Sequence, residues 1–296
     1  MEILVVGLVK NEQLDRVRDE AEKRGHTVDG CYTTELVTHV SKDGFAPTLR
    51  GKQMDSYDLI YLWTVGKRRW EWYTAALYLH EKFGTIIVNE KSIASDYHFF
   101  LTPAIDYLKQ VKEDLPFPRS CVFFDTKSVK SAVEGFDFPA ILKISGGRQG
   151  KGVFKINSIN EIKKIIDEHD EAQSFDLREF IPNDGDIRVF TVGYKAIGAM
   201  KRTPKEGDFR SNISQGGGGE KFDLSKRPDV QKIAERVSLV MRTEIAGVDI
   251  MLHSETGEPY ILEINPGPQF TGLEKFTKTN AALEIVKYFE KLQKEK

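Results

Sequence analysis

Two carboxylates and an amide have the residue types and spacing best suited to binding a metal ion: Asp249, Glu263 and Asn265. They lie in two alternating apolar runs, AGVDIML and YILEINPG, around the turn sequence HSETGEP, a pattern that predicts a β-hairpin. A register centred near Thr256 places Asp249 across from Glu263, and Asn265 shares the face of Glu263 because side chains alternate along a strand. Two carboxylates about 5 Å apart repel by roughly 3 kcal/mol at an effective dielectric constant near 20, so they need a positive partner. Hard oxygen ligands predict a magnesium site, with a solvated polar edge as the alternative.

A glycine-rich stretch, SGGRQGKG, is the second candidate site. Successive peptide N–H groups in such a turn can bind phosphate, and Lys143 on the strand before it could reach the same phosphates. The spacing does not fit a Walker A motif, because the loop joins two predicted strands and no helix follows it. A plain glycine-rich hairpin with an exposed lysine remains the alternative. The candidate glycines are Gly146, Gly147, Gly150 and Gly152.

Three predicted units position these residues. Residues 1–90 alternate strands and helices, which indicates a small parallel sheet with helices on its faces, and Gly7 lacks the spacing of a dinucleotide-binding motif. Residues 91–180 contain strands around the glycine loop and a helix opened by a capping box at Ser158 and Glu161. Residues 181–296 contain two hairpins, a polar segment 204–223 expected as a surface loop, and an amphipathic helix. In the second hairpin the alternation directs Leu262 and Ile264 to the apolar face.

Three ordered sequence blocks carry a resemblance to a known family. They are PAILKISGGRQGKGVF, then REFIPNDGDIRVFTVG with MKRTPKEGDFRSN, and AGVDIML…YILEINPGP followed by GLEK. With these blocks the chain resembles ATP-grasp proteins, and among them the RimK-like carboxylate–amine ligases, over nearly its whole length. The resemblance implies an α/β fold, α+β in its C-terminal part: an ATP-grasp fold preceded by a Rossmann-like pre-ATP-grasp domain.

The resemblance also implies a nucleotide site. Lys143 contacts the α- and β-phosphates under a flap formed by residues 146–152. The hinge whose backbone reads adenine is formed by Glu179, Phe180 and Ile181. Asp186 lies near the ribose and the nucleotide.

The resemblance further implies the reacting end of the site. Within the motif FRSN, Arg210 and Asn212 approach the γ-phosphate and the acyl phosphate made from it, and Ser211 belongs to the same nucleotide-binding segment. Lys201, Arg202 and Lys205 are near Arg210 in sequence and would add positive charge; a solvated charged surface is the alternative for this cluster. By the same resemblance, Asp249, Glu263 and Asn265 hold two magnesium ions, with manganese as a substitute.

One position departs from the family. Members usually carry another nucleotide-binding lysine in the helix after the NE motif, but no lysine lies between Lys91 and Lys109. An ungapped alignment puts Phe100 at this position, with His98 nearby. The departure keeps open a second interpretation, a non-catalytic ATP-binding module of ATP-grasp fold.

The expected activity is an ATP-dependent carboxylate–amine ligase that forms an amide through an acyl phosphate. The family adds glutamate or a similar amino acid to a protein C-terminus, a carrier protein or a coenzyme, and its members are often dimeric or tetrameric. The net charge of −2 gives no global attraction to nucleic acid or to anionic membranes. Two cysteines, Cys31 and Cys121, and the absence of a signal peptide or membrane-length apolar run indicate a cytoplasmic protein. The sequence does not identify the amino acid or the acceptor, and it leaves single addition or polymerisation open.

Overall fold

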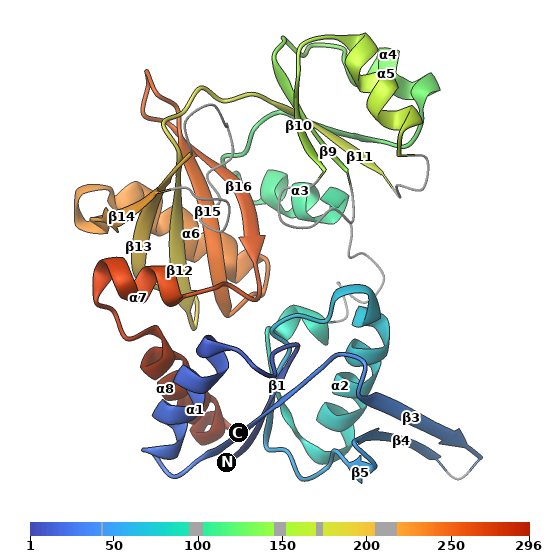
Figure 1. Cartoon of the computed structure of the whole chain (residues 1–296), viewed down its shortest axis with the longest axis vertical. Helices are drawn as coiled ribbons and strands as arrows, with labels where there is room; N and C mark the ends of the chain where they lie inside the picture. Colours follow the sequence, from blue (N-terminus) through green and yellow to red (C-terminus); the bar gives the residue numbers. More distant parts are fainter. Residues whose placement is uncertain (43, 95–102, 145–151, 170–173, 205–217) are drawn as a thin grey trace.

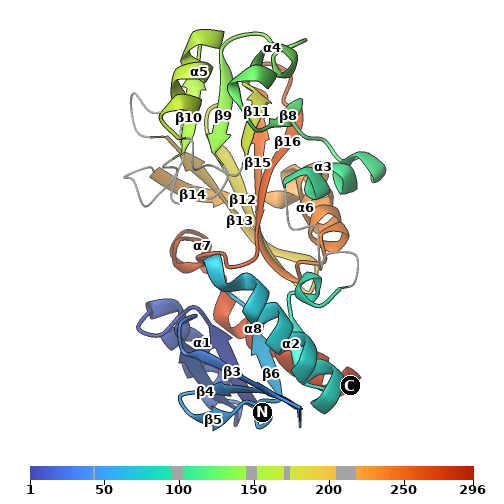
Figure 2. The same ribbon diagram turned by 90° about the vertical axis from the view of Figure 1, so that its right-hand side faces the viewer.

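The computed structural model describes residues 1–42, 44–94, 103–144, 152–169, 174–204 and 218–296. Its sheets are arranged in three tiers, with both chain termini in the N-terminal tier (Figures 1 and 2). Among the described residues, no helix has the length and apolar character needed to cross a membrane.

The N-terminal tier is a four-stranded parallel sheet with the strand order β2-β1-β6-β7. In β1, Ile3 and Val5 pack toward α1 and α8, whereas Leu4 and Val6 pack toward α2. Every β1 residue after Glu2 is buried because helices cover both faces, which explains the continuous apolar run. The predicted small parallel sheet is therefore confirmed. Its elements are β1 (Glu2–Val6), α1 (Glu12–Glu22), β2 (Thr27–Cys31), β6 (Leu59–Tyr61), η1 (Gly66–Arg68), α2 (Arg69–Phe83), β7 (Ile86–Val88), η2 (Glu90–Ser92) and, from the far end of the chain, α8 (Ala281–Glu295).

A second, antiparallel sheet interrupts this tier and was not predicted. The hairpin of β3 (Leu36–Ser41) and β4 (Gly44–Leu49), with the short β5 (Lys52–Gln53), extends from the body beside α2 (Figure 1). Most of β3 is exposed, so its sequence lacks the apolar alternation from which a strand is recognised.

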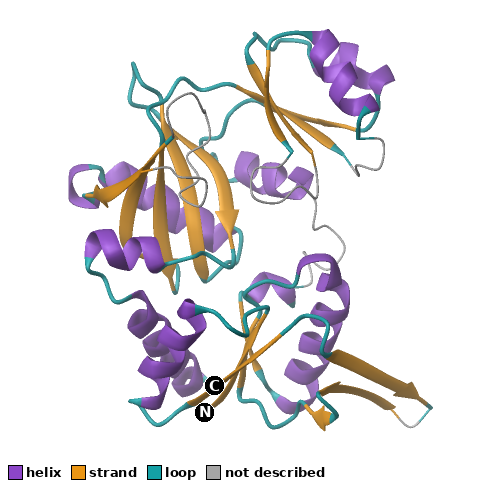
Figure 3. Cartoon of the chain, viewed as in Figure 1, coloured by secondary structure: helices purple, strands orange, loops and turns teal. Residues whose placement is uncertain are grey.

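The central tier is an antiparallel sheet with the order β10-β9-β11-β8. Two helices pack on its outer face, and Figure 3 shows them on the side away from the C-terminal sheet. Ser158 Oγ accepts the N–H of Glu161 at 3.3 Å, as the predicted capping box requires, while the Glu161 carboxylate accepts the N–H of Asn157 at 2.9 Å. The elements are α3 (Pro103–Lys112), β8 (Ser120–Phe123), η3 (Thr126–Ser128), α4 (Val129–Ala132), β9 (Ala140–Ile144), β10 (Val153–Ile156), α5 (Ile159–Asp167) and β11 (Phe175–Glu179).

The C-terminal tier is an antiparallel sheet with the order β14-β13-β12-β15-β16, and it contains both predicted hairpins. Part of the expected loop 204–223 is instead strand β14, which pairs with β13. Gly219 makes this possible, because a Cβ there would lie 2.6 Å from the Phe276 ring. The elements are β12 (Asp186–Val192), β13 (Lys195–Thr203), β14 (Gly218–Phe222), η5 (Leu224–Lys226), α6 (Pro228–Val240), β15 (Ile245–Leu252), β16 (Pro259–Asn265) and α7 (Thr271–Thr277).

The two faces of the C-terminal sheet differ in character. Ile187, Val189, Val248 and Ile250 pack against α6. On the opposite face, Phe190, Val192 and Ile245 join the N-terminal core together with α8, so α8 ties the end of the chain to the N-terminal sheet. The rest of this opposite face carries the charged residues of the candidate site. The domain boundaries at residues 90 and 180 stay predictions.

Candidate active site

The register of the β15–β16 hairpin brings the predicted carboxylates together. Asp249 pairs with Glu263, and Gly247 pairs with Asn265. A bulge follows Asp249, so Ile250 pairs with Ile261 and leaves Leu262 without a partner in the ladder. Glu263 and Asn265 line a cavity of about 850 Å³, whereas Asp249 is only 6% exposed.

The bulge corrects one expectation about the apolar face of this hairpin. Ile261 and Ile264 pack in the core under α6, whereas Leu262 is not part of that core. The extra residue shifts the alternation by one position, which pattern reading with a strict period of two does not anticipate.

Asp249 is held by two arginines, one from the adjacent strand β12 and one from β13 beyond it. Arg188 lies opposite it in the ladder and donates from Nε to Oδ1 and from Nη2 to Oδ2, both at 2.7 Å. Arg202 Nη2 lies 2.8 Å from Asp249 Oδ2, and Arg202 Nε donates to Asp186 Oδ1 at 2.6 Å. Arginine therefore supplies the positive partner that the carboxylate at position 249 requires.

Burial shapes the protonation of this four-residue cluster. Burial acts to raise the pKa of the Asp249 carboxyl, but Arg188 and Arg202 outweigh it and the pKa is lowered. The pKa of Asp186 is raised, first by burial and then by the neighbouring Asp249 charge. Asp186 thus faces Arg202 within the sheet, and the charge of Arg202 is compensated by Asp186 and Asp249.

Lys143 comes from the central sheet to the same region. It lies on β9 and is half-buried, and burial followed by the neighbouring Arg178 charge lowers the pKa of its ammonium to about 8. The carboxylates of Glu263 and Asp249 act in the opposite direction, so Lys143 faces the carboxylates of the other sheet. Ile144 N–H donates to Gly152 C=O at 2.8 Å and closes the base of the glycine loop.

Arg178 is a residue of this site that the sequence argument missed. Its Nε and Nη2 donate to Asp176 Oδ2 at 2.8 and 2.7 Å, and its Nη1 donates to the bulged Leu262 carbonyl at 2.7 Å. Tyr107 donates its hydroxyl to the same carboxylate at 2.8 Å. Arg178 thereby links the central sheet to the strand that carries Glu263. The i, i+2 pair in FDLREF, which puts Asp176 and Arg178 on one strand face, was the available signal.

The predicted hinge begins at Glu179, the last residue of β11. Glu179 N–H donates to Arg119 C=O at 2.9 Å, and Ile181 C=O accepts from Asn183 Nδ2 at 2.7 Å. Within the described part of the chain, the N–H and C=O of Phe180 and the N–H of Ile181 have no hydrogen-bond partner. Lys155 Nζ lies 3.8 Å from the centre of the Phe180 ring. The hinge therefore offers free main-chain groups of the kind that adenine recognition needs.

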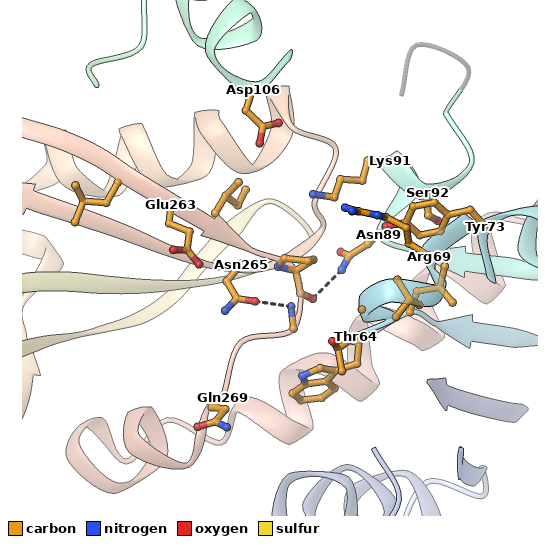
Figure 4. Close-up of a pocket in the computed structure, with 18 of the residues that line it drawn as sticks. Thr64, Arg69, Tyr73, Asn89, Lys91, Ser92, Asp106, Glu263, Asn265 and Gln269 are labelled. Atoms are coloured by element: carbon orange, nitrogen blue, oxygen red, sulfur yellow. Dashed lines mark hydrogen bonds between the residues drawn. The ribbon is translucent and has the colours of Figure 1, made fainter. Parts of the chain in front are cut away.

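The cavity lies between the N-terminal tier and the β16 strand (Figure 4). Pro266 C=O accepts from Asn89 Nδ2 at 2.9 Å and from the Tyr61 hydroxyl at 3.0 Å. Asn265 Oδ1 accepts the N–H of Gly267 at 3.0 Å, and a Cβ on Gly267 would lie 2.2 Å from the Trp63 carbonyl oxygen. This close approach is why the NPG turn needs glycine. The turn fixes the two predicted ligands, Glu263 and Asn265, against the N-terminal tier.

Several predicted site residues lie outside the described residues. They are Gly146, Gly147, Gly150, Lys205, Arg210, Ser211 and Asn212, together with Phe100 and His98 at the point of departure from the family.

The described residues include no group of three or more His, Cys, Asp or Glu side chains suited to a metal. The predicted ligand set differs from such a group because its third member is an amide. Its donors are hard oxygens, and the cluster of two arginines with Asp186 and Asp249 is neutral when all are charged. Lys143 and Arg178 are the described cations that act on Glu263. Glu263 and Asn265 offer oxygens that suit a magnesium ion at the cavity surface. Both oxygens of Asp249 are bound by Arg188 and Arg202, so Asp249 would have to exchange an arginine for the metal to become a ligand.

The fold is that of ATP-grasp ligases. The ATP-grasp ligase PsnB, complexed with a minimal precursor, has a TM-score of 0.72 at 19% identity over 98% of each chain. The macrocyclase MdnC from Microcystis aeruginosa MRC, bound with precursor peptide MdnA, has a TM-score of 0.64 at 16% identity over 98% of this chain and 100% of the other. These likenesses confirm the ATP-grasp fold with mixed helices and strands.

A model of the RimK-like ATP-grasp domain matches residues 106–289. A probable alpha-L-glutamate ligase of Vibrio vulnificus (strain YJ016) is 30% identical over 96% of this chain and 94% of its own length. A protein of the same description from Legionella pneumophila (strain Corby) is 32% identical over 94% of this chain and 91% of the relative. The chain therefore belongs to the RimK-like ATP-grasp family and is an ATP-dependent carboxylate–amine ligase, as its sequence blocks predicted.

Proposed function

We propose that the protein activates a substrate carboxylate with ATP as an acyl phosphate and then joins it to an amine. The observation that carries this proposal is the convergence of Lys143 from the central sheet with Glu263 and Asp249 from the C-terminal sheet. A cation for the phosphates and hard oxygens for a metal then face one another across the junction of two sheets. This is the electrostatic arrangement that phosphoryl transfer needs.

In the first step a carboxylate oxygen attacks the γ-phosphorus and the bond to the β-phosphate oxygen breaks, which releases ADP. In the second step the amine nitrogen attacks the acyl carbon, phosphate leaves, and the nitrogen loses a proton. Lys143 binds the α- and β-phosphates, the hinge from Glu179 to Ile181 binds adenine, and Arg210 with Asn212 stabilises the acyl phosphate. Glu263, Asn265 and Asp249 would hold two magnesium ions, which neutralise phosphate charge when bound. The protein contributes positioning and charge, and no side chain acts as nucleophile.

The relatives support the choice of substrates. The curated relatives carry the name glutamate ligase, and several ligases of the same fold were solved with precursor peptides, one of them with magnesium and ADP. We propose glutamate or a similar amino acid as the amine, and a protein C-terminus, a carrier protein or a coenzyme as the acceptor. The departure at Phe100 favours the rival, a non-catalytic ATP-binding module.

A turnover assay separates the two. The protein is incubated with ATP and magnesium, a panel of amino acids and peptides with free C-termini, and products are read by ADP release and by the mass of the new amide. A ligase releases ADP only when both substrates are present and gains product of the matching mass. A module that binds ATP without either product would overturn the proposal.

The metal ligands are tested by Glu263→Gln, which keeps the size of the side chain and removes its charge. We expect kcat/KM to fall by about 10²–10³-fold with the thermal midpoint unchanged, the loss typical of one charge-stabilising group. Glu255→Gln on the exposed turn of the same hairpin is the control and should keep full activity. Equal activity of the two variants would remove Glu263 from the site.

A further inference from the structure

The wall of the cavity opposite Glu263 and Asn265 is cationic. Arg69 at the start of α2 and Lys91 in η2 both line the cavity, and Figure 4 shows both side chains extending toward it from the N-terminal tier. Neither side chain forms an ion pair or a hydrogen bond with any residue that the structure describes. The other arginines of the site that the structure describes are paired: Arg178 with Asp176, and Arg188 and Arg202 with Asp249.

The position of Arg69 gives no benefit to the helix that carries it. A cation in the first turn opposes the helix dipole, whose N-terminal end is already positive. Lys67 and Arg68, just before it, are exposed, whereas Arg69 is partly buried toward the cavity. Its guanidinium carbon lies 5.7 Å from the centre of the Trp70 ring, a contact that leaves its N–H donors unused. The helix N-terminus and the guanidinium together favour an anion at this place.

Hydrogen bonds of Asn89 and of the Lys91 N–H hold the main chain at Lys91. Asn89 is buried and has a left-handed backbone, and its side chain donates to Pro266 C=O while its Oδ1 accepts the N–H of Ile245 at 3.1 Å. The Lys91 N–H itself donates to Arg242 C=O at 3.1 Å. These bonds fix Lys91 relative to the turn that follows Asn265.

Among the described residues, no carboxylate forms an ion pair with the Lys91 ammonium. Burial lowers the pKa of its ammonium, and the nearby Asp106 carboxyl, itself shifted upward in pKa by burial, opposes this without forming an ion pair. A partly desolvated ammonium without a bonded partner is costly, and an anion bound in the cavity would offset that cost.

We propose that Arg69 and Lys91 together bind a substrate carboxylate that takes no part in the reaction, and so select acidic substrates. The inference rests on the proposed ligase function and adds the residues that set its specificity. The reacting group of the substrate lies beside Glu263 and Asn265, and the non-reacting carboxylate lies across the cavity on the N-terminal wall. That carboxylate belongs either to a free acidic amino acid or to an acidic residue at the end of a peptide acceptor.

Binding measurements test the proposal without turnover. With ADP and magnesium present, calorimetry compares L-glutamate with L-glutamine, and the peptide Glu-Glu-Glu with Gln-Gln-Gln. The wild-type protein should bind the acid of at least one pair tenfold or more tightly than its amide. The pair that shows the preference identifies the source of the carboxylate. No preference in either pair would overturn the proposal.

Variants then assign the preference to the two cations. Arg69→Gln and Lys91→Met should each reduce the acid-to-amide ratio at least tenfold, Arg69→Lys should restore part of it, and the exposed control Arg68→Gln should leave it unchanged. In turnover the loss should appear in KM for the acidic substrate, with kcat and the ADP dissociation constant retained. A preference that survives in both Arg69→Gln and Lys91→Met would overturn the assignment.

A purely structural role is distinguishable as well. Lys91→Met removes an uncompensated charge and should leave the thermal midpoint unchanged or raised, whereas a structural lysine would lower it. If no substrate pair releases ADP yet acids bind tenfold better than amides, the ligase function fails while the carboxylate site stands.

Discussion

The cationic groups of the C-terminal sheet and those of the N-terminal cavity wall face the same interior region but differ in how their charge is compensated. Arg188 and Arg202 are bound by Asp249 and Asp186 at 2.6–2.8 Å, so their charges are used inside the protein. Arg69 and Lys91 have no such partner among the residues described. Paired cations position an acidic residue, whereas unpaired cations beside a cavity remain available for a ligand.

Buried carboxylates show the same contrast. Asp249, with two arginines, has a lowered pKa. Glu244, at the junction of the N-terminal and C-terminal tiers, accepts the N–H of Glu90 at 2.7 Å and the hydroxyl of Tyr288 at 3.3 Å, and it has no cationic partner in the described part of the chain. Burial raises its pKa to about 7. Burial is similar at the two sites, so the partner determines whether the charge persists.

The largest effect is expected where a pair is broken. Arg188→Met leaves Asp249 buried with one arginine, and the free energy of unfolding should fall by about 3 kcal/mol in urea titrations. Arg236→Met is the matched control, because its ion pair with Glu113 is exposed at 3.3 Å and should contribute less than about 1 kcal/mol. Equal losses in both variants would mean that pairing at Asp249 has no special structural weight.

Sequence patterns alone do not predict most of this contrast between paired and unpaired cations. The facing of Asp249 and Glu263 was predictable because both lie on one short hairpin, where alternation and turn length fix the register. The pairing of Asp249 with Arg188 was not, because it joins strands 61 residues apart whose adjacency depends on sheet topology. The convergence of Arg69 and Lys91 depends on how the N-terminal tier packs against β16, through Asn89 and Trp63. Local periodicity carries no information on that packing.

An unpaired buried carboxylate should reveal itself by the pH dependence of stability. Because the pKa of Glu244 is higher in the folded protein, the folded state binds more protons between about pH 4.5 and 7, and its contribution to stability falls as the pH rises through that window. Glu244→Gln should therefore raise the free energy of unfolding at pH 8 by at most about 3 kcal/mol, which appears as a higher thermal midpoint. Near pH 4.5 the substitution should have little effect.

The paired Glu290 provides the opposite sign. Its pKa is lowered to about 2, chiefly by its hydrogen bond with Arg24, so Glu290→Gln should destabilise the protein at pH 7 and lose that effect as the pH falls toward 2. Midpoints measured by calorimetry across this range decide the matter. Two variants with the same sign at neutral pH would contradict the distinction between paired and unpaired carboxylates.

The smallest expected effect is on the pH dependence of ATP affinity, through the protonation of Lys143. Its pKa of about 8 in the free protein means that the ammonium loses its proton as the pH rises through this value. Bound phosphates stabilise the charged form and raise this pKa, so binding takes up a proton above about pH 8 and none well below it. ATP affinity should therefore be flat near pH 6.5 and fall by up to about tenfold per pH unit above 8.

Calorimetry in two buffers of different ionisation enthalpy measures both the affinity and the proton uptake. Lys143→Arg is the informative variant, because its guanidinium stays charged throughout and should abolish the pH dependence while retaining a cation for the phosphates. Lys143→Ala should bind ATP weakly at every pH. If the wild-type affinity is independent of pH between about 8 and 9.5, then Lys143 does not contact the phosphates. The Lys143 ammonium would then be compensated within the protein by Glu263 and Asp249, as Arg188 and Arg202 are compensated in the C-terminal sheet.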